Sequence, residues 1–167
     1  MGVEMDLRSS APADCTKAEL DAFFNHVKKG GQVSTAGLKL GVKRAQRLLF
    51  LYHGPMLAGT SAIKRPLPAY KKNVFRSAGV PDLEQEYKFE LGYVVVATAY
   101  QEQKLSRDLV KAALDDYTTT PIFATSRTDK DRMHRTLKRF CFVQVGTPYP
   151  SKLEGCELLL FIRRVCQ

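Results

Sequence analysis

The sequence contains no tryptophan, few histidines and few cysteines. Among 167 residues there are three histidines and four cysteines, and no two cysteines form a CxxC pair. Structural zinc sites need four thiolate or imidazole ligands, usually supplied as closely spaced pairs. The sequence therefore predicts a protein whose chemistry uses no metal.

Long apolar runs are also missing. No stretch approaches the roughly 20 apolar residues of a membrane-spanning helix, and no apolar signal-peptide core follows the first ten residues. Gly2 follows Met1, but Asp6 stands where a myristoylation signal requires Ser or Thr. We therefore expect a cytoplasmic protein that does not engage a membrane.

The remaining composition is that of an ordinary globular protein. Apolar residues make up 44% of the chain, and its length suits one hydrophobic core. No repeat, low-complexity segment or linker divides the sequence, so we expect residues 1–167 to form a single domain. The net charge of +9 favours an anionic ligand, a nucleic acid or an acidic protein as partner.

Hydrophobic periodicity predicts alternating strands and helices. Thr16 and Glu19 have the spacing of a capping box for the first helix, and Ser34 or Thr35 is the expected cap of the second. Strands are expected at 2–7, 47–52, 56–63, 86–98, 118–125, 142–145 and 156–163, further helices at 69–77, 105–114 and 129–140, and a loop at 146–155. This order predicts an α/β protein, with a mixed sheet covered by helices on both faces.

The junction between the strand ending near Thr98 and the helix starting at Leu105 is the most informative segment. Helix N-termini present unpaired N–H groups and the positive end of the helix dipole, so they bind phosphate. Lys104 and Arg107 add positive charge, and Ser106 offers a hydroxyl. From these residues alone a diphosphate site and a plain turn with solvated basic side chains both remain open.

Residues 90–110 (ELGYVVVATAYQEQKLSRDLV) and 121–146 (PIFATSRTDKDRMHRTLKRFCFVQVG) resemble the GNAT acetyltransferase superfamily. The resemblance extends over almost the whole chain and implies a GNAT-like fold with a mostly antiparallel sheet of about seven strands. The family's Q/R-x-x-G-x-G/A loop corresponds to Gln101, Glu102, Gln103, Lys104, Leu105 and Ser106. Lys104 thus replaces the first glycine, while Cys141-Phe142 stands where a Gly-Phe pair is common.

The resemblance implies acetyl-CoA as acyl donor and assigns residues to it. Backbone groups of Val94 and Val96 should hold the pantetheine arm, and Lys130 stands where the family often has Asn. The pyrophosphate is assigned to Gln101, Gln103, Lys104, Leu105, Ser106 and Arg107. Leu137 replaces a tyrosine that in many members protonates the departing thiolate.

Acetyl transfer to an amine requires a base and profits from an acid. By the resemblance Glu90 is the expected base, although a strand glutamate is also often simply exposed. Glu86 and His53 are weaker candidates. Tyr149, in the sequence GTPYPSK, is the candidate replacement acid, and a rigid proline-flanked turn explains that segment equally well.

Three functions remain open from the sequence. The first is an N-acetyltransferase that acts by direct attack on an amine-bearing small molecule or protein. The second is a GNAT-fold enzyme acting on an RNA- or DNA-linked amine, suggested by the basic residues Lys39, Lys43, Arg44, Arg47, Lys64, Arg65, Lys71, Lys72 and Arg76. The third is an inactive GNAT-fold binding protein, suggested by Lys104 and Leu137. The resemblance also implies a homodimer.

Overall fold

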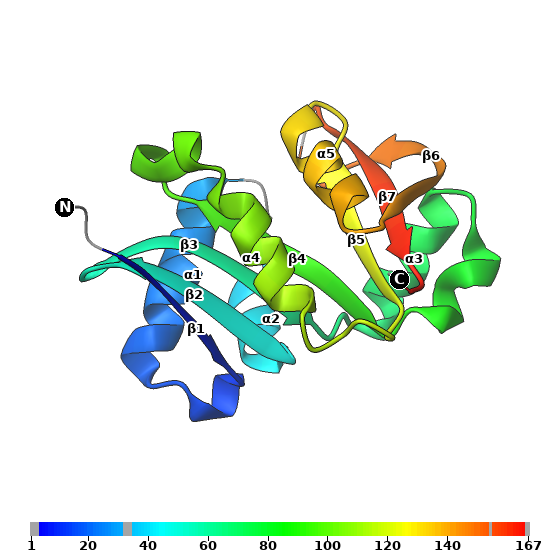
Figure 1. The fold of residues 1–167 in the computed structure, drawn as a ribbon. Coiled ribbons are helices and arrows are strands. Elements are labelled where there is room, and N and C mark those ends of the chain that lie inside the picture. The colour runs from blue at the N-terminus through cyan, green and yellow to red at the C-terminus, as the bar shows by residue number, and fades with distance from the viewer. Residues whose placement is uncertain (1–3, 32–34, 154, 166–167) are drawn as a thin grey trace.

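The computed structural model describes residues 4–31, 35–153 and 155–165. Over these residues one sheet has the strand order β1-β2-β3-β4-β5-β7-β6 (Figure 1). Its strands are β1 (Met5–Ser10), β2 (Arg47–His53), β3 (Met56–Lys64), β4 (Phe89–Val96), β5 (Ile122–Arg127), β6 (Val143–Pro150) and β7 (Glu157–Arg163). Every neighbouring pair is antiparallel except the parallel pair β4–β5. The predicted mixed, mostly antiparallel sheet is therefore confirmed.

Helices cover both faces of this sheet, as predicted. They are α1 (Lys17–Gly30), α2 (Leu38–Arg44), α3 (Pro68–Ser77), α4 (Leu105–Leu114) and α5 (Asp131–Arg139). In Figure 1, α4 lies in front of strands β2 to β4, and α1 and α2 lie behind them. Successive side chains of β2 point to opposite faces of the sheet and pack against the helices there. Leu49 packs with Val110 of α4, whereas Phe50 packs with Phe23 of α1. None of the described helices is long and apolar enough to cross a bilayer.

Local sequence explains where α1 starts and ends. The Thr16 hydroxyl accepts from the Glu19 amide at 3.1 Å, and the Glu19 carboxylate accepts from the Thr16 amide at 2.8 Å, so the predicted capping box is confirmed. The helix ends at Gly31, which adopts a left-handed φ of 69°. The prediction for α2 was wrong at its start: Gly37 is the cap, Thr35 precedes the helix, and Ser34 lies outside the described residues.

Several element boundaries also differ from the sequence prediction. β1 runs on to Ser10 where the prediction ended at residue 7, β5 starts at Ile122 where it began at residue 118, and α5 spans Asp131–Arg139 where it spanned 129–140; residues 2–3 of the first predicted strand lie outside the described residues. Residues Pro81–Glu86 form a 3₁₀ helix, η2, because proline at the first helical position has the required φ; β4 therefore starts only at Phe89. β6 extends through the predicted loop to Pro150. It is an edge strand with a register shift between Val145 and Tyr149, and prolines are tolerated on an edge because no ladder hydrogen bond is lost.

Candidate active site

The parallel strands β4 and β5 pair over two positions and then separate. Phe89 lies opposite Ile122 and Glu90 opposite Phe123, and no later pair follows among the described residues. A cavity of about 150 Å³ lies in the resulting gap, between Leu91–Val95 of β4 and Ala124–Arg127 of β5. Met133 and Leu137 of α5 close one side of it. The separation leaves the facing edges of β4 and β5 without a ladder partner in the interior of the sheet.

A bulge in β4 sets which backbone groups face this gap. Tyr93 has a φ of 54°, the ladder with β3 shifts there, and the Thr60 hydroxyl donates to the Tyr93 carbonyl at 2.8 Å. Beyond the bulge the Ala97 amide donates to Ala58 of β3 at 2.8 Å. Strand alternation therefore directs the backbone of Val96 toward β5, and that of Val94 two residues earlier likewise. This geometry is compatible with the pantetheine role predicted for Val94 and Val96.

His26 of α1 supports the same strand from the other face. Its Nε2 lies 2.9 Å from the Val95 carbonyl oxygen. Burial lowers the pKa of His26 below its ordinary value, so the ring is neutral near pH 7. Because a carbonyl only accepts, Nε2 carries the proton. The sequence analysis missed this residue, since a single helical histidine gives no signal of its partner.

The predicted phosphate loop is a short 3₁₀ helix, η3 (Thr98–Gln103), followed directly by α4. Lys104 is the cap between them and has φ 57° and ψ 27°, the left-handed conformation. Residues 101–104 are exposed, whereas Leu105 is buried, so Leu105 offers only its backbone N–H. The left-handed backbone explains in physical terms why glycine suits this position. Here a lysine has adopted it, which brings a cation to the start of α4.

Replacing Lys104 with Gly should stabilise the protein by up to about 1 kcal/mol. The left-handed conformation costs an ordinary residue about 1–2 kcal/mol, and glycine gives back part of that gain through its larger unfolded-state entropy. Chemical denaturation of wild type, Lys104→Gly and Lys104→Ala measures this. Lys104→Ala, which loses the same charge but keeps a Cβ, is the control. Equal stability of the Gly and Ala variants would contradict the prediction.

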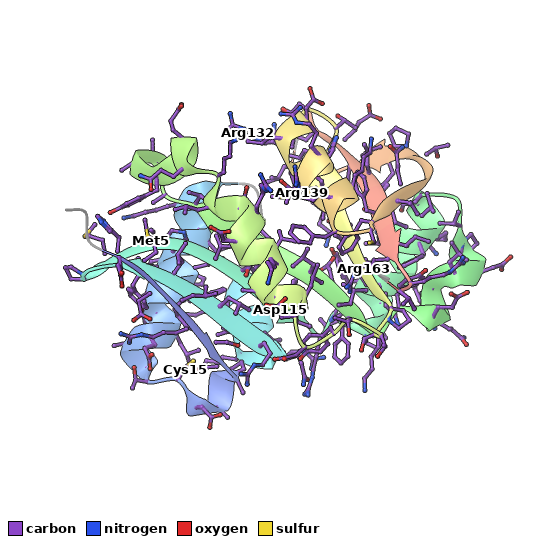
Figure 2. The ribbon with its side chains drawn as sticks, in the orientation of Figure 1. Met5, Cys15, Asp115, Arg132, Arg139 and Arg163 are labelled. Atoms are coloured by element: carbon purple, nitrogen blue, oxygen red, sulfur yellow. The ribbon has the colours of Figure 1, made fainter. Side chains whose placement is uncertain are left out.

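Further cations lie at the same end of the gap. Parallel strands end at the same sheet edge, so the start of α5 after β5 lies beside η3 after β4. Arg132 of α5 donates to the Gln101 carbonyl at 3.3 Å across the gap, and Figure 2 shows its position on α5. Lys130 caps α5 at this end, and Gln101 itself donates to the Val96 carbonyl at 3.3 Å. Together with Lys104 and Arg107, Arg132 and Lys130 thus concentrate positive charge at the mouth of the gap, which we call its positive rim.

The two weaker base candidates lie elsewhere. His53, at the end of β2, has its Nδ1 2.8 Å from the Tyr100 hydroxyl of η3, so it supports the loop. Glu86 ends η2, where its carboxylate pairs with exposed Arg164 at 3.3 Å. Neither residue lines the gap cavity. Their positions favour a structural role for both.

Glu90 lies at the point where β4 and β5 begin to separate. It is only 2% exposed, so the alternative of an exposed strand glutamate is wrong. The Tyr70 hydroxyl donates to its Oε2 at 2.8 Å, and Lys64 Nζ lies 2.5 Å from Oε1. Burial by itself lowers the pKa of Lys64, but Glu90 and Tyr93 outweigh that effect and hold the pKa above its ordinary value. Lys64, Glu90 and Tyr70 thus form a buried, charge-compensated group.

A second, larger cavity of about 360 Å³ adjoins the first. α2, α3 and the end of β6 surround it, and it shares Lys64, Tyr70, Tyr93 and Thr125 with the gap cavity. Tyr149 lines it, is 5% exposed, and has no hydrogen-bond partner for its hydroxyl among the described residues. Burial, reinforced by the charge of Glu90, raises the pKa of Tyr149 well above its ordinary value, so the phenol stays protonated.

The site therefore consists of two adjoining cavities with a buried carboxylate at their junction. One is bordered by free strand edges and a positive rim, and the other contains a protonated, unpartnered phenol. Of the predicted residues, Val94 and Glu90 line the first cavity and Tyr149 the second, while Gln101 to Arg107 and Lys130 lie at the mouth of the gap. Lys64 and Tyr70 were not predicted. Lys64 faces Glu90 across the β3–β4 ladder, a pairing that only the strand register discloses.

Comparison with known proteins finds the architecture but no close sequence relative. No family model matches the sequence, and no curated protein matches it. An acyl-CoA N-acyltransferase from Pseudomonas aeruginosa superposes with a TM-score of 0.65 at 17% identity, over 96% of this chain and 99% of that one. The ribosomal-protein-S18-alanine N-acetyltransferase from Escherichia coli gives 0.66 at 13% identity, over 97% and 96%.

A third similar structure is a putative acetyltransferase from Salmonella typhimurium with its cofactor acetyl-CoA. It superposes with a TM-score of 0.64 at 16% identity, over 98% of this chain and 95% of that one. Other similar structures are described as acetyltransferases of the GNAT family. The strand order, the separation of β4 from β5 and these superpositions agree: the chain has the fold of the GNAT acetyltransferases.

Proposed function

We propose that the protein transfers an acetyl group from acetyl-CoA to the amine of an acceptor held in the second cavity. The observation that carries the proposal is the gap between β4 and β5, which has free strand edges along one side and the start of α4 at its mouth. A thioester with a long pantetheine arm and a diphosphate has the complementary chemistry. The adjoining cavity supports direct attack in a ternary complex.

The residues at the mouth of the gap suit a CoA diphosphate. Lys104, Arg107 and Lys130 supply positive charge, and the first turn of α4 supplies N–H groups, including those of Leu105 and Ser106. Gln101 and Gln103 are exposed beside them. Val94 and Val96 offer strand-edge groups to the arm. Acetyl-CoA, when bound, would supply an activated carbonyl to the second cavity.

The reaction forms a C–N bond, breaks the C–S bond and moves two protons. Glu90 would accept the proton that the attacking amine releases, through a water molecule, since its oxygens already contact Lys64 and Tyr70. Tyr149 would donate a proton to the departing thiolate in place of the tyrosine that Leu137 replaces. Its raised pKa keeps the phenol protonated at neutral pH, so that it can hydrogen-bond to the departing thiolate, and the same shift makes full transfer of the proton uphill.

Acetyl-CoA at about 100 times its Kd should stabilise the protein by about 2.7 kcal/mol. Thermal unfolding with and without acetyl-CoA measures this, and ATP, a polyanion without a pantetheine arm, is the control. We expect a shift with acetyl-CoA that ATP does not reproduce. An unchanged transition at millimolar acetyl-CoA would contradict the proposal.

The other two functions are separated by simple measurements. An RNA- or DNA-linked acceptor predicts salt-dependent binding to tRNA or DNA. Two of the basic residues that suggested it are paired internally: Lys64 with Glu90 and Lys71 with Glu84 at 3.5 Å. An inactive binding protein predicts acetyl-CoA binding without turnover on any amine. We therefore place transfer to a small-molecule or protein amine first.

A further inference from the structure

The charged side chains that border the larger cavity are all positive. Three cations border it from three different parts of the chain: Arg44 on α2, Arg65 just after β3, and Lys152 after β6. All three side chains are exposed, so they form the cavity's outer rim. No carboxylate is among the described residues that line this cavity. A ligand that enters it therefore meets a positive field.

These three charges are not compensated within the described part of the chain. Arg65 has only a neutral partner, since its Nε donates to the Gln46 side-chain oxygen at 2.6 Å. The side chains of Arg44 and Lys152 make no hydrogen bond or ion pair with any described residue. Lys64, in contrast, lies at the inner wall and is neutralised by Glu90. The free positive charge is thus at the rim and not at the junction with the gap.

A buried polar group indicates independently that a ligand belongs here. The Tyr149 hydroxyl is buried without a partner among the described residues, on a side chain that is only 5% exposed. A hydroxyl buried without a hydrogen bond is costly, and such groups in native proteins usually find a partner. Because Tyr149 lines the larger cavity, a polar atom of an occupant can supply it.

Apart from the cations, the tyrosines and the neutral polar residues Asn73, Thr125 and Ser151, the lining is apolar. Leu38 and Leu40 of α2, Leu67 before α3, and Leu153 and Leu158 near the last hairpin border the space. An occupant that satisfies the whole cavity therefore combines an anionic group for the rim with a short apolar body. To react, it must also direct an amine toward Lys64 and Tyr70, which line both cavities and contact Glu90 of the gap cavity.

We infer that the acceptor is a small amine carrying an anionic group, of the amino-acid or phosphorylated-amine type, with the anion held by Arg44, Arg65 and Lys152. This inference rests on the proposed acetyl transfer for the identity of the reacting group. The anion binds at the rim, the apolar part lies along the leucines, and the amine faces the gap. A carboxylate and a phosphate ester share this chemistry, and the experiment separates them.

The test uses pairs of amines that differ only in the anion. Leucine is compared with leucinamide, β-alanine with β-alaninamide, and phosphoethanolamine with ethanolamine, as acceptors with acetyl-CoA. Their N-acetylated forms are compared as ligands without it. We expect the anionic member of at least one pair to bind and react at least tenfold better. A preference within the first two pairs identifies a carboxylate, and one confined to the third a phosphate. Equal behaviour, or no binding, in all pairs overturns the inference.

Charge-removing variants locate the effect. Arg44→Gln combined with Lys152→Gln should reduce the preference for the anionic member at least tenfold and leave affinity for the neutral member unchanged. Lys17→Gln, an exposed cation on α1 away from the cavity, is the matched control and should retain the preference. Equal loss for both members of a pair would overturn the inference. Turnover of neutral amines with no preference for an anionic acceptor would overturn the inference but leave the proposed acetyl transfer intact. Binding of the anionic ligands without binding of acetyl-CoA would overturn the proposed acetyl transfer but leave the anion site intact.

Discussion

The variant Glu90→Leu is expected to lose about 3–5 kcal/mol of unfolding free energy. Removing one member of a buried ion pair leaves the other charge without compensation, which is the costly outcome. Here that charge is on Lys64, whose Nζ lies 2.5 Å from Glu90 Oε1 in a nearly closed environment. Urea denaturation at neutral pH measures the loss.

A double variant serves as the control for this expectation. Replacing Lys64 with Met together with Glu90→Leu removes both charges, and such exchanges are often neutral or stabilising. We therefore expect the double variant to recover most of the lost stability. If it is as unstable as Glu90→Leu alone, apolar packing and not the ion pair explains the effect.

The conservative variant Glu90→Gln addresses catalysis. It keeps the size of the side chain and one acceptor oxygen, but its amide NH2 group donates where the carboxylate accepted from Lys64 or Tyr70, and it cannot take up a proton. Because it also leaves Lys64 uncompensated, turnover is measured under conditions in which the variant is shown to be folded. We expect turnover to fall by roughly 10²–10⁴-fold, the usual contribution of a general base, with acetyl-CoA binding retained. Steady-state kinetics and thermal shifts separate the two quantities, and unchanged turnover would show that Glu90 is not the base.

Gly146→Ala has the second large expected effect, a loss of about 2–4 kcal/mol. Gly146 lies in β6 with a φ of 72°, and a Cβ added there would lie 2.1 Å from the Ala78 carbonyl oxygen at the end of α3. Because that neighbour is backbone, the strand or the helix must move. Left-handed strain of about 1–2 kcal/mol adds to the cost. Chemical denaturation measures the total.

Gly155→Ala is the matched comparison. It has a φ of 76° but no atom within 4 Å of the added Cβ, so it bears the backbone strain without the collision. We expect it to lose only about 1 kcal/mol. Equal losses of stability at the two positions would show that α3 and β6 move apart without cost and would contradict the prediction for Gly146. Since β6 also carries Tyr149, the larger cavity should deform in Gly146→Ala alone, and acceptor KM should rise there.

The sequence predicts those parts of the fold whose cause is local. α4 begins and ends where periodicity predicts, and the α1 capping box forms because its partners are three residues apart. Errors arise where distant contacts decide. The extension of β6 depends on its pairing with β7, and proline signals alone favoured a loop there.

The candidate site likewise has parts that the sequence predicts and parts that depend on distant contacts. The loop predicted to bind phosphate, Gln101 to Ser106, could be located because strand, turn and helix signals are contiguous there, whereas Glu90 was chosen by the resemblance to the GNAT superfamily. The pairing of Glu90 with Lys64 and Tyr70 joins three elements and depends on the register of β3 against β4. The left-handed Lys104 could not be predicted from residue type, because lysine disfavours that conformation.

The bond between Arg132 and the Gln101 carbonyl has a consequence for how a long ligand enters. At its inner end the gap is held by the β4–β5 pairs and by packing of α4 against Leu137. At its mouth the hydrogen bond from Arg132 to the Gln101 carbonyl, which is exposed, is the one that joins the two sides among the described residues, and it contributes a net stabilisation of about 0.5–1.5 kcal/mol. The gap is thus held firmly at its inner end and only weakly at its mouth. We expect that breaking this bond lets a long ligand, such as the proposed acetyl-CoA, enter along the side of the gap without its nucleotide end having to pass through it.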